Sequence, residues 1–281
     1  MAVEHLADAA EEDQQLEQHY EDPGVDYLYS RIWGEDIHYG IYADETESIE
    51  AATRRAKLVM AEPLPLAPEF EVLEVGCGYG STARFLAERF GCRVVATNIS
   101  QAQLARAEQL TSGTPAAGRV SFAIADYHDL PYEHGSFDCW WCQESLVHSD
   151  DKPRVLAEAY RILKPGGYAV VSDQIFRPDR LQPPELEAVR DRYHTETVAG
   201  PAQYAAMIQA AGFELIEQRD WQQHAVIHRR KIYDRLQELM PELRVEVASE
   251  TLERTCMTWS AWAKLAEEGK LGFHYYLARK P

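Results

Sequence analysis

The chain has 281 residues, of which 46% are hydrophobic, and it carries a formal net charge of −18 at pH 7. This hydrophobic content can fill the core of a large domain, and the negative charge repels phosphate backbones and anionic lipids. We therefore expect one folding unit with an inserted lobe, which binds neither nucleic acid nor a membrane surface.

The five cysteines are scattered and odd in number, which favours reduced thiols over a disulfide framework. Cys139 and Cys142 form a C-x-x-C pair, but a zinc site needs two further ligands at matching spacing and none is evident. No metal site is predicted.

The N-terminal part comprises an acidic tail, residues 1–20, and a lid and helix, residues 21–62. The tail lacks the basic and apolar regions of a secretion signal, and no apolar run approaches the roughly 20 residues that span a bilayer, so we expect a cytoplasmic protein. The aromatic stretch Tyr27–Tyr42 follows no clean period and predicts an irregular, packed lid. A helix is expected over Ser48–Met60, before the breaker run Pro63–Pro68.

Residues 63–173 alternate short apolar runs with helical patterns. The predicted strands are Glu71–Val75, Arg93–Thr97, Val120–Ala125, Phe137–Trp141 and Tyr168–Ser172. The predicted helices between them are Ser81–Phe90, Gln101–Leu110 and Lys152–Leu163, the last ending in a Lys-Pro-Gly-Gly stop at residues 164–167. This alternation predicts an α/β fold with a doubly wound, mostly parallel sheet.

Two further strands, Phe213–Trp221 and Phe273–Arg279, together with a helix over Pro201–Ala211, are expected to complete a seven-stranded sheet. They belong to the segments 201–222 and 271–281. Residues 174–200 and 223–270 do not fit the alternation, and we expect them to form an inserted, mostly helical cap. Because open α/β sheets bind ligands at the carboxyl edge of their strands, the cap would close a substrate pocket there.

The strongest chemical signal is the run Val72–Gly80, in which Gly76, Gly78 and Gly80 lie between a strand and a helix. Glycines permit a sharp turn and a close approach to a ligand, and the helix start offers free N–H groups. The spacing G-x-G-x-G and the non-acidic Asn98 after the second strand both disfavour a dinucleotide. The turn could alternatively serve only tight strand–helix packing.

Five motifs in this order resemble the class I S-adenosylmethionine-dependent methyltransferases: the glycine turn, Ala125–Tyr127, Leu130–Tyr132, Gly135–Asp138 and Leu163–Gly167. The resemblance implies S-adenosylmethionine as cofactor, with Glu74 suited to its cationic amino acid end. It also implies an adenine contact from Asp126, for which a helix cap or turn is the structural alternative.

A narrower resemblance is to the sarcosine/dimethylglycine N-methyltransferases that make glycine betaine. It rests on Ile32–Tyr42, on the Gly-Tyr-Gly turn at residues 78–80 and on Gln143–Ser149, and it extends from about Tyr20 to Arg279. It implies methylation of a small amine, and an osmoprotective product would suit the acidic composition. The chain departs from the family at Asp173–Phe176, where an Asp-Pro-Met-Gln run is usual, and at Cys77 and Ser81 in the glycine turn.

The resemblance gives candidate site residues in three groups. The cofactor-binding candidates are Trp33, Glu74, Gly76, Gly78, Gly80, Asn98, Ile99, Asp126, Tyr127 and Gln143. His38 and His148 are the catalytic candidates, because an imidazole can take the proton of an amine or bind a carboxylate; each could instead be structural. The substrate-binding candidates are Tyr29 and Tyr39, which with Trp33 could be cation–π partners, Trp33 being the first choice and core packing the alternative for each ring. Arg192 is the candidate carboxylate partner, which could equally form a surface ion pair.

The sequence leaves the acceptor and even catalysis open. The acceptor could be another small molecule, as in natural-product N- or O-methyltransferases, since one cofactor site serves many acceptors. The chain could also bind S-adenosylmethionine without catalysis, whereas an NAD-dependent oxidoreductase is disfavoured by the glycine spacing. The sequence does not give the oligomeric state or the number of methyl groups transferred.

Overall fold

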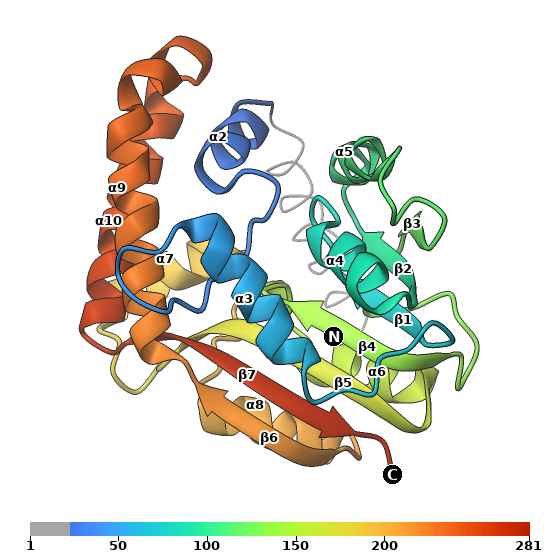
Figure 1. Cartoon of the computed structure of the whole chain (residues 1–281). Coiled ribbons are helices and arrows are strands. Elements are labelled where there is room, and N and C mark those ends of the chain that lie inside the picture. Colours follow the sequence, from blue (N-terminus) through green and yellow to red (C-terminus); the bar gives the residue numbers. More distant parts are fainter. Residues whose placement is uncertain (1–22) are drawn as a thin grey trace, which may run out of the picture.

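The computed structural model describes residues 23–281, so the predicted acidic tail lies outside the described part of the chain. Its strands form one sheet in the order β3-β2-β1-β4-β5-β7-β6 (Figure 1). The strands are β1 (Glu71–Val75), β2 (Arg93–Asn98), β3 (Val120–Ile124), β4 (Phe137–Gln143), β5 (Leu163–Phe176), β6 (Glu214–Asp220) and β7 (Leu271–Arg279). Only β7 runs antiparallel to its neighbours β5 and β6, which confirms the predicted seven-stranded, mostly parallel sheet.

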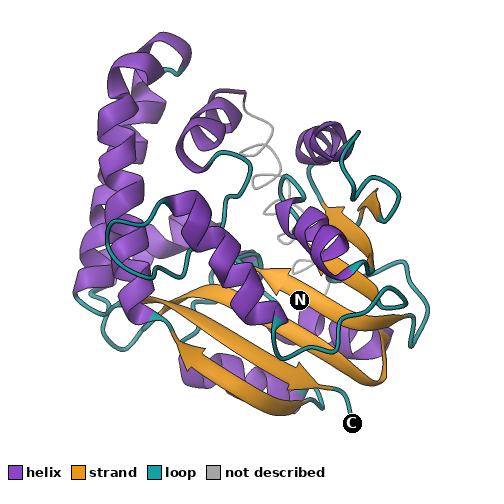
Figure 2. Ribbon diagram, in the orientation of Figure 1, coloured by secondary structure: helices purple, strands orange, loops and turns teal. Residues whose placement is uncertain are grey.

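Helices cover both faces of this sheet (Figure 2). They are α2 (Pro23–Trp33), α3 (Ile49–Ala61), α4 (Ser81–Phe90), α5 (Gln101–Thr111), α6 (Lys152–Ile162), α7 (Pro183–Tyr193), α8 (Pro201–Ala210), α9 (Gln222–Glu246) and α10 (Ser249–Glu267), with a short 3-10 turn η1 (Leu146–His148). The buried side chains of α3 and α4 form one core with the sheet, and those of α6 and α8 form a second core on the opposite face. The fold is therefore a three-layer, doubly wound α/β architecture.

The N-terminal lid is more regular than the sequence analysis expected. Its first part is the helix α2, so the prediction of an irregular segment over Tyr27–Tyr42 was wrong up to Trp33. Val25, Leu28, Tyr29 and Ile32 are buried at helical spacing and pack in one cluster with side chains of α9. Contact with α9, which is distant in the sequence, thus buries a face of α2 that the local periodicity of the sequence did not reveal.

Strand β5 is longer at both ends than predicted. It begins at Leu163, although the Lys-Pro-Gly-Gly run interrupts the regular register with β4 and Gly166 has φ +81°, and it continues to Phe176 instead of ending at Ser172. The antiparallel partner β7 pairs with it from Tyr168 to Phe176, which explains the extension at its carboxyl end. This places Asp173 and Gln174, where the chain departs from the family pattern, at the carboxyl end of a central strand.

The helices α9 and α10 form an antiparallel pair that stands away from the sheet at the left of Figure 1. The helix α2 packs against α9, and Tyr193 at the end of α7 stacks on Trp262 of α10 with ring centroids 6.3 Å apart. The two segments outside the strand–helix alternation therefore come together with the lid above the carboxyl ends of the strands.

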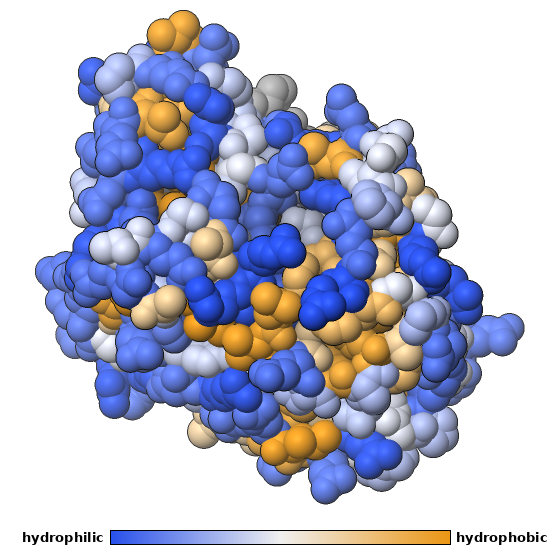
Figure 3. Space-filling view, in the orientation of Figure 1, coloured by the Kyte–Doolittle hydropathy of each residue, from blue (hydrophilic) through white to orange (hydrophobic). Residues whose placement is uncertain are grey.

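The cysteines of the C-x-x-C pair are both buried in β4, but Cys139 belongs to the core on one sheet face and Cys142 to the core on the other. They cannot chelate one ion. Figure 3 shows a mostly hydrophilic surface with hydrophobic side chains exposed in places. Val245 of α9 and Met257 of α10 are exposed hydrophobic residues. No helix within residues 23–281 has the length and apolar character needed to cross a membrane.

Candidate active site

Two adjoining cavities lie between the sheet edge and the cap, with volumes of about 100 and 110 Å³. The first, which we call the inner chamber, is walled by the carboxyl ends of β1 to β4 and their following loops. Its lining includes Gly76, Gly78, Asn98, Ile99, Ala125, Tyr127 and Gln143. Six of these residues were predicted cofactor contacts, and the structure brings them together.

The glycine turn forms a wall of bare backbone. Gly76 has φ +64°, and a Cβ built on it would lie 2.1 Å from Oγ of Ser145. Gly78 has φ +51°, and its Cβ would lie 3.2 Å from Ile37 of the lid. No side chain fits at Gly76 without moving the loop after β4, so the chain passes close to the chamber only because these residues are glycines. At Gly80 the obstructing neighbour is Phe122, which indicates packing and not ligand approach.

Two buried polar atoms beside this turn have no hydrogen-bond partner in the described part of the chain: Oε2 of Glu74 and Nε2 of Gln143. The Gln143 carbonyl accepts from Thr82 Oγ1 at 3.0 Å and from Trp141 Nε1 at 3.3 Å, which leaves its amide N–H groups as the available donors. Burial raises the pKa of Glu74 to about 7. A ligand with an ammonium and a carboxylate would satisfy both groups, which fits the amino acid end of S-adenosylmethionine.

The far wall of the inner chamber is built by turns after β2 and β3. The Asn98 side chain is held within its own turn, donating to Gln103 Oε1 at 2.7 Å and accepting from the Ser100 N–H at 3.1 Å. Asp126 does not line the chamber, because its carboxylate accepts from the backbone N–H of His128 and lies 2.8 Å from Nδ1 of the same residue. The adenine contact predicted for Asp126 remains a prediction.

The second cavity, the outer chamber, lies beneath the lid and the α9–α10 pair. In its wall Trp33 meets Tyr29 and Trp259 edge to face, with ring centroids 5.3 and 4.9 Å away, and Tyr29 and Trp259 are stacked with centroids 6.3 Å apart. The predicted substrate residues Tyr39 and Arg192 also line it. Trp33, a candidate both for the cofactor and for a cation–π contact with the amine, lines this chamber and not the inner one.

Both chambers share Ile37, His38, Glu144 and His148, so the two predicted catalytic histidines stand at their boundary. Nδ1 of His38 lies 3.1 Å from Oε2 of Glu144, within ion-pair distance although short of full hydrogen-bond geometry. Burial disfavours the charged form of His38, but the Glu144 carboxylate outweighs it and the pKa of His38 is raised. The boundary therefore carries an imidazole with increased proton affinity.

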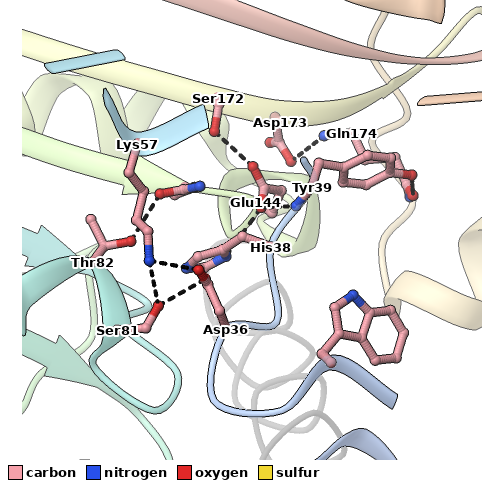
Figure 4. A network of polar contacts seen from close by, with 12 residues as sticks. Asp36, His38, Tyr39, Lys57, Ser81, Thr82, Glu144, Ser172, Asp173 and Gln174 are labelled. Carbon is pink, nitrogen blue, oxygen red and sulfur yellow. Dashed lines mark hydrogen bonds and ion pairs between the residues drawn. The ribbon is translucent and has the colours of Figure 1, made fainter. Parts of the chain in front are cut away.

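Glu144 is held in place by contacts from two directions (Figure 4). Its carboxylate accepts from the Tyr39 backbone N–H at 3.1 Å and from Ser172 Oγ at 2.7 Å. Its backbone has φ +51°, an uncommon conformation for a non-glycine residue. Strain of this kind persists only where the surroundings impose it, and here it aims the carboxylate at the lid.

A buried ion pair fixes the lid above the glycine turn (Figure 4). Lys57 Nζ of α3 lies 2.6 Å from Asp36, and Ser81 Oγ at the start of α4 donates to the same carboxylate at 2.8 Å. Burial alone would raise the pKa of Asp36, but the charge of Lys57 overrides it and holds that pKa well below the usual range. His38 is thereby positioned two residues from a rigid anchor.

Several outer-chamber residues were not predicted as site residues: Glu144, Gln174, Tyr193, His228, Arg229, Trp259 and Trp262. Glu144 adjoins Gln143 in a motif that had been recognised, so its position could have been inferred. The family resemblance included the segment Gln222–Asp234 of α9 but assigned no site residue in α9 or α10, and the packing of the cap brings them to the sheet edge.

The family model, the curated relatives and the solved structures that resemble this chain include methyltransferases in each case. The family model for the methyltransferase domain matches residues 73–171. A sarcosine/dimethylglycine N-methyltransferase of Halorhodospira halochloris is 34% identical, with 96% of this chain and 98% of that protein covered. The 27-O-demethylrifamycin SV methyltransferase of Amycolatopsis mediterranei is 32% identical over 90% of this chain and 93% of its own.

Among solved structures, a candidate sarcosine dimethylglycine methyltransferase from Galdieria sulphuraria superposes with a TM-score of 0.86 at 26% identity. The match covers 93% of this chain and 98% of that one. Lid, sheet and cap are therefore all shared.

Proposed function

The chain belongs to the family of S-adenosylmethionine-dependent methyltransferases that includes the sarcosine/dimethylglycine N-methyltransferases, and we propose that it methylates sarcosine and dimethylglycine to glycine betaine. The observation that carries this proposal is the aromatic outer chamber, which opens onto the inner chamber at His38 and Glu144. Aromatic faces attract a quaternary ammonium group, which is what the final methyl transfer creates.

The inner chamber would hold S-adenosylmethionine through its bare glycine backbone, Glu74 and the Gln143 amide. When bound, this cofactor supplies a methyl group already activated on a sulfonium. The remaining work falls to the chain: to orient the amine, hold it neutral and exclude water. The lid and cap that enclose the outer chamber serve the last of these.

His38 would take the proton of the incoming amine. A proton on Nδ1 faces the Glu144 carboxylate and leaves Nε2 as the acceptor nitrogen. A secondary or tertiary amine is mostly protonated near neutral pH, so a base at this position increases the reactive fraction. His148 lines the same boundary and is the second candidate for this role.

Aromatic side chains from two elements would surround the methylated nitrogen. Trp33 and Tyr29 come from α2 and Trp259 from α10, whereas the Tyr39 ring lies against Phe273, His228 and Arg229. A cation placed over such rings gains about 0.5–2 kcal/mol per good contact, depending on desolvation.

A cytoplasmic role in osmoprotection would follow from this product. Glycine betaine is a compatible solute, and the net charge of −18 suits a salt-rich interior. The acidic surface keeps the protein soluble and repels anionic partners.

A second candidate function is methylation of a larger natural product. The observation that favours it is the 32% identity to the rifamycin methyltransferase, which extends over nearly the whole chain. The two candidate functions differ in the acceptor and share the cofactor site.

The test is product formation by mass spectrometry, with S-adenosylmethionine and either sarcosine or dimethylglycine, at low and high salt. Glycine betaine formed from dimethylglycine supports the proposal. Cofactor binding without product from either amine contradicts it and directs the search to other acceptors, and binding with no turnover of any acceptor would indicate a non-catalytic protein.

A further inference from the structure

The helix α9 carries an arginine that is buried against the outer chamber. Arg229 is 8% exposed and lines the cavity, and its Nε donates to the Tyr39 hydroxyl, with the guanidinium carbon 5.0 Å from the centre of the Tyr39 ring. Within residues 23–281 no carboxylate forms an ion pair with it, whereas its neighbour Arg230 pairs with Glu45 and Glu267. A guanidinium does not deprotonate, so this buried charge lacks a counterion in the described chain.

A chain of hydrogen bonds leads from Arg229 through Tyr39 and Gln174 to Tyr193. The Tyr39 hydroxyl donates to Gln174 Oε1 at 2.6 Å, the Gln174 amide donates to the Tyr193 hydroxyl, and Trp262 Nε1 donates to the same hydroxyl at 3.0 Å. These bonds occupy the Gln174 carbonyl and both phenol oxygens as acceptors. The groups left to contact a ligand are donors: the guanidinium N–H groups and one phenolic O–H. That O–H belongs to Tyr193 in this arrangement, and would belong to Tyr39 if the oxygen and nitrogen of the Gln174 amide were exchanged.

A wall that offers a cation and only donors selects an anion. Glu144 is the one acidic residue in the described lining of the outer chamber, and it lies at the boundary with the inner chamber. Arg229 and Glu144 together match a zwitterion, with its carboxylate at the arginine and its nitrogen at the chamber boundary.

We infer that Arg229, with the Tyr39–Gln174–Tyr193 network behind it, binds the carboxylate of the methyl acceptor and so selects amino acids over amino alcohols. This inference rests on the proposed function and specifies how its site recognises the substrate. Arg192 was the carboxylate partner predicted from the sequence, but it is only partly buried and donates to Tyr29 at 2.7 Å. A charge contact is stronger at the more buried arginine.

The test compares dimethylglycine with N,N-dimethylethanolamine, which keeps the amine and replaces the carboxylate by a hydroxymethyl group. Arg229→Met is expected to lower kcat/KM for dimethylglycine by roughly 30-fold or more, while the value for the alcohol changes little. Arg229→Lys should retain part of the preference, and Arg230→Met on the same helix should retain all of it. Because the readout is a ratio within one variant, partial unfolding cannot mimic it.

Affinity for S-adenosylhomocysteine should be unchanged in Arg229→Met, since the residue lines only the outer chamber. An unchanged preference for the acid in Arg229→Met overturns the inference. If the wild-type protein methylates neither amine, the proposed function fails, and calorimetric binding of the two amines decides the inference separately. The inference is supported if the wild type binds dimethylglycine in preference to the alcohol and Arg229→Met loses that preference. It is overturned if both proteins show the same ratio of affinities for the two amines.

Discussion

Replacing Glu144 by Gln removes the negative charge beside His38 while keeping a similar shape. The two carboxylate oxygens accept separately, Oε2 from the Tyr39 N–H and Oε1 from Ser172 Oγ, so the amide oxygen can keep the Tyr39 bond while the amide nitrogen faces the Ser172 hydroxyl. The His38 and Glu144 side chains are 5% and 11% exposed, and their closest atoms lie 3.1 Å apart. An opposite charge at this distance shifts a pKa by about 1–3 units. Burial is already the largest single influence on His38 and lowers its pKa, and without the Glu144 charge only the more weakly acting Asp36 opposes it.

The sign of the pH dependence follows from these shifts. In the wild type the pKa of His38 lies above its ordinary 6.5, so kcat/KM for dimethylglycine should rise as the pH increases through that raised value. In Glu144→Gln the rise should move to lower pH by about 1–3 units. The maximal rate should also fall, because a weaker base is left at the chamber boundary.

The assay is the pH profile of kcat/KM together with NMR titration of the His38 ring in the free enzyme. Ser172→Ala is the matched control, because it removes a hydrogen bond to the Glu144 carboxylate and leaves its charge in place. A His38 pKa that is unchanged or higher in Glu144→Gln would refute the reasoning.

Three further substitutions test other parts of the site. Asp36→Asn leaves Lys57 buried without its partner and should lower the free energy of unfolding by about 3–5 kcal/mol in urea titrations; a loss below about 1 kcal/mol would contradict the anchoring role. Because the pKa of Asp36 is held below its usual 3.8, the same stabilisation should be present in the wild type at neutral pH and be lost on acidification. Gly76→Ala places a methyl group against Ser145 in a backbone conformation that disfavours it, and calorimetry should show loss of S-adenosylhomocysteine binding; retained affinity would mean the turn does not contact the cofactor. Trp259→Leu should raise KM for dimethylglycine by roughly 2- to 30-fold with little change in cofactor affinity, and an unchanged KM would remove the cation–π contact.

The sheet and the cofactor side of the site could be predicted because their signals are local. A strand, a glycine turn and a helix follow one another within Glu71–Phe90, and parallel strands place their carboxyl ends at one edge. Gly76, Asn98 and Gln143 therefore reach the same chamber although they lie far apart in the sequence.

The acceptor side could not be predicted to the same depth, because it depends on packing between distant segments. The helical face of α2 is defined by its contact with α9, some 200 residues later, and Arg229 and Trp259 become site residues only when that contact forms. The orientation of the Asp126 carboxylate depends on the neighbouring His128, which no strand-end motif specifies.

The most direct test of the central claim is transfer of a ¹³C-methyl group from labelled S-adenosylmethionine to dimethylglycine, followed by NMR. Labelled glycine betaine should form and accumulate with catalytic turnover by the purified chain. Saturating cofactor binding with the label remaining on S-adenosylmethionine would contradict the assignment of the outer chamber to this amine.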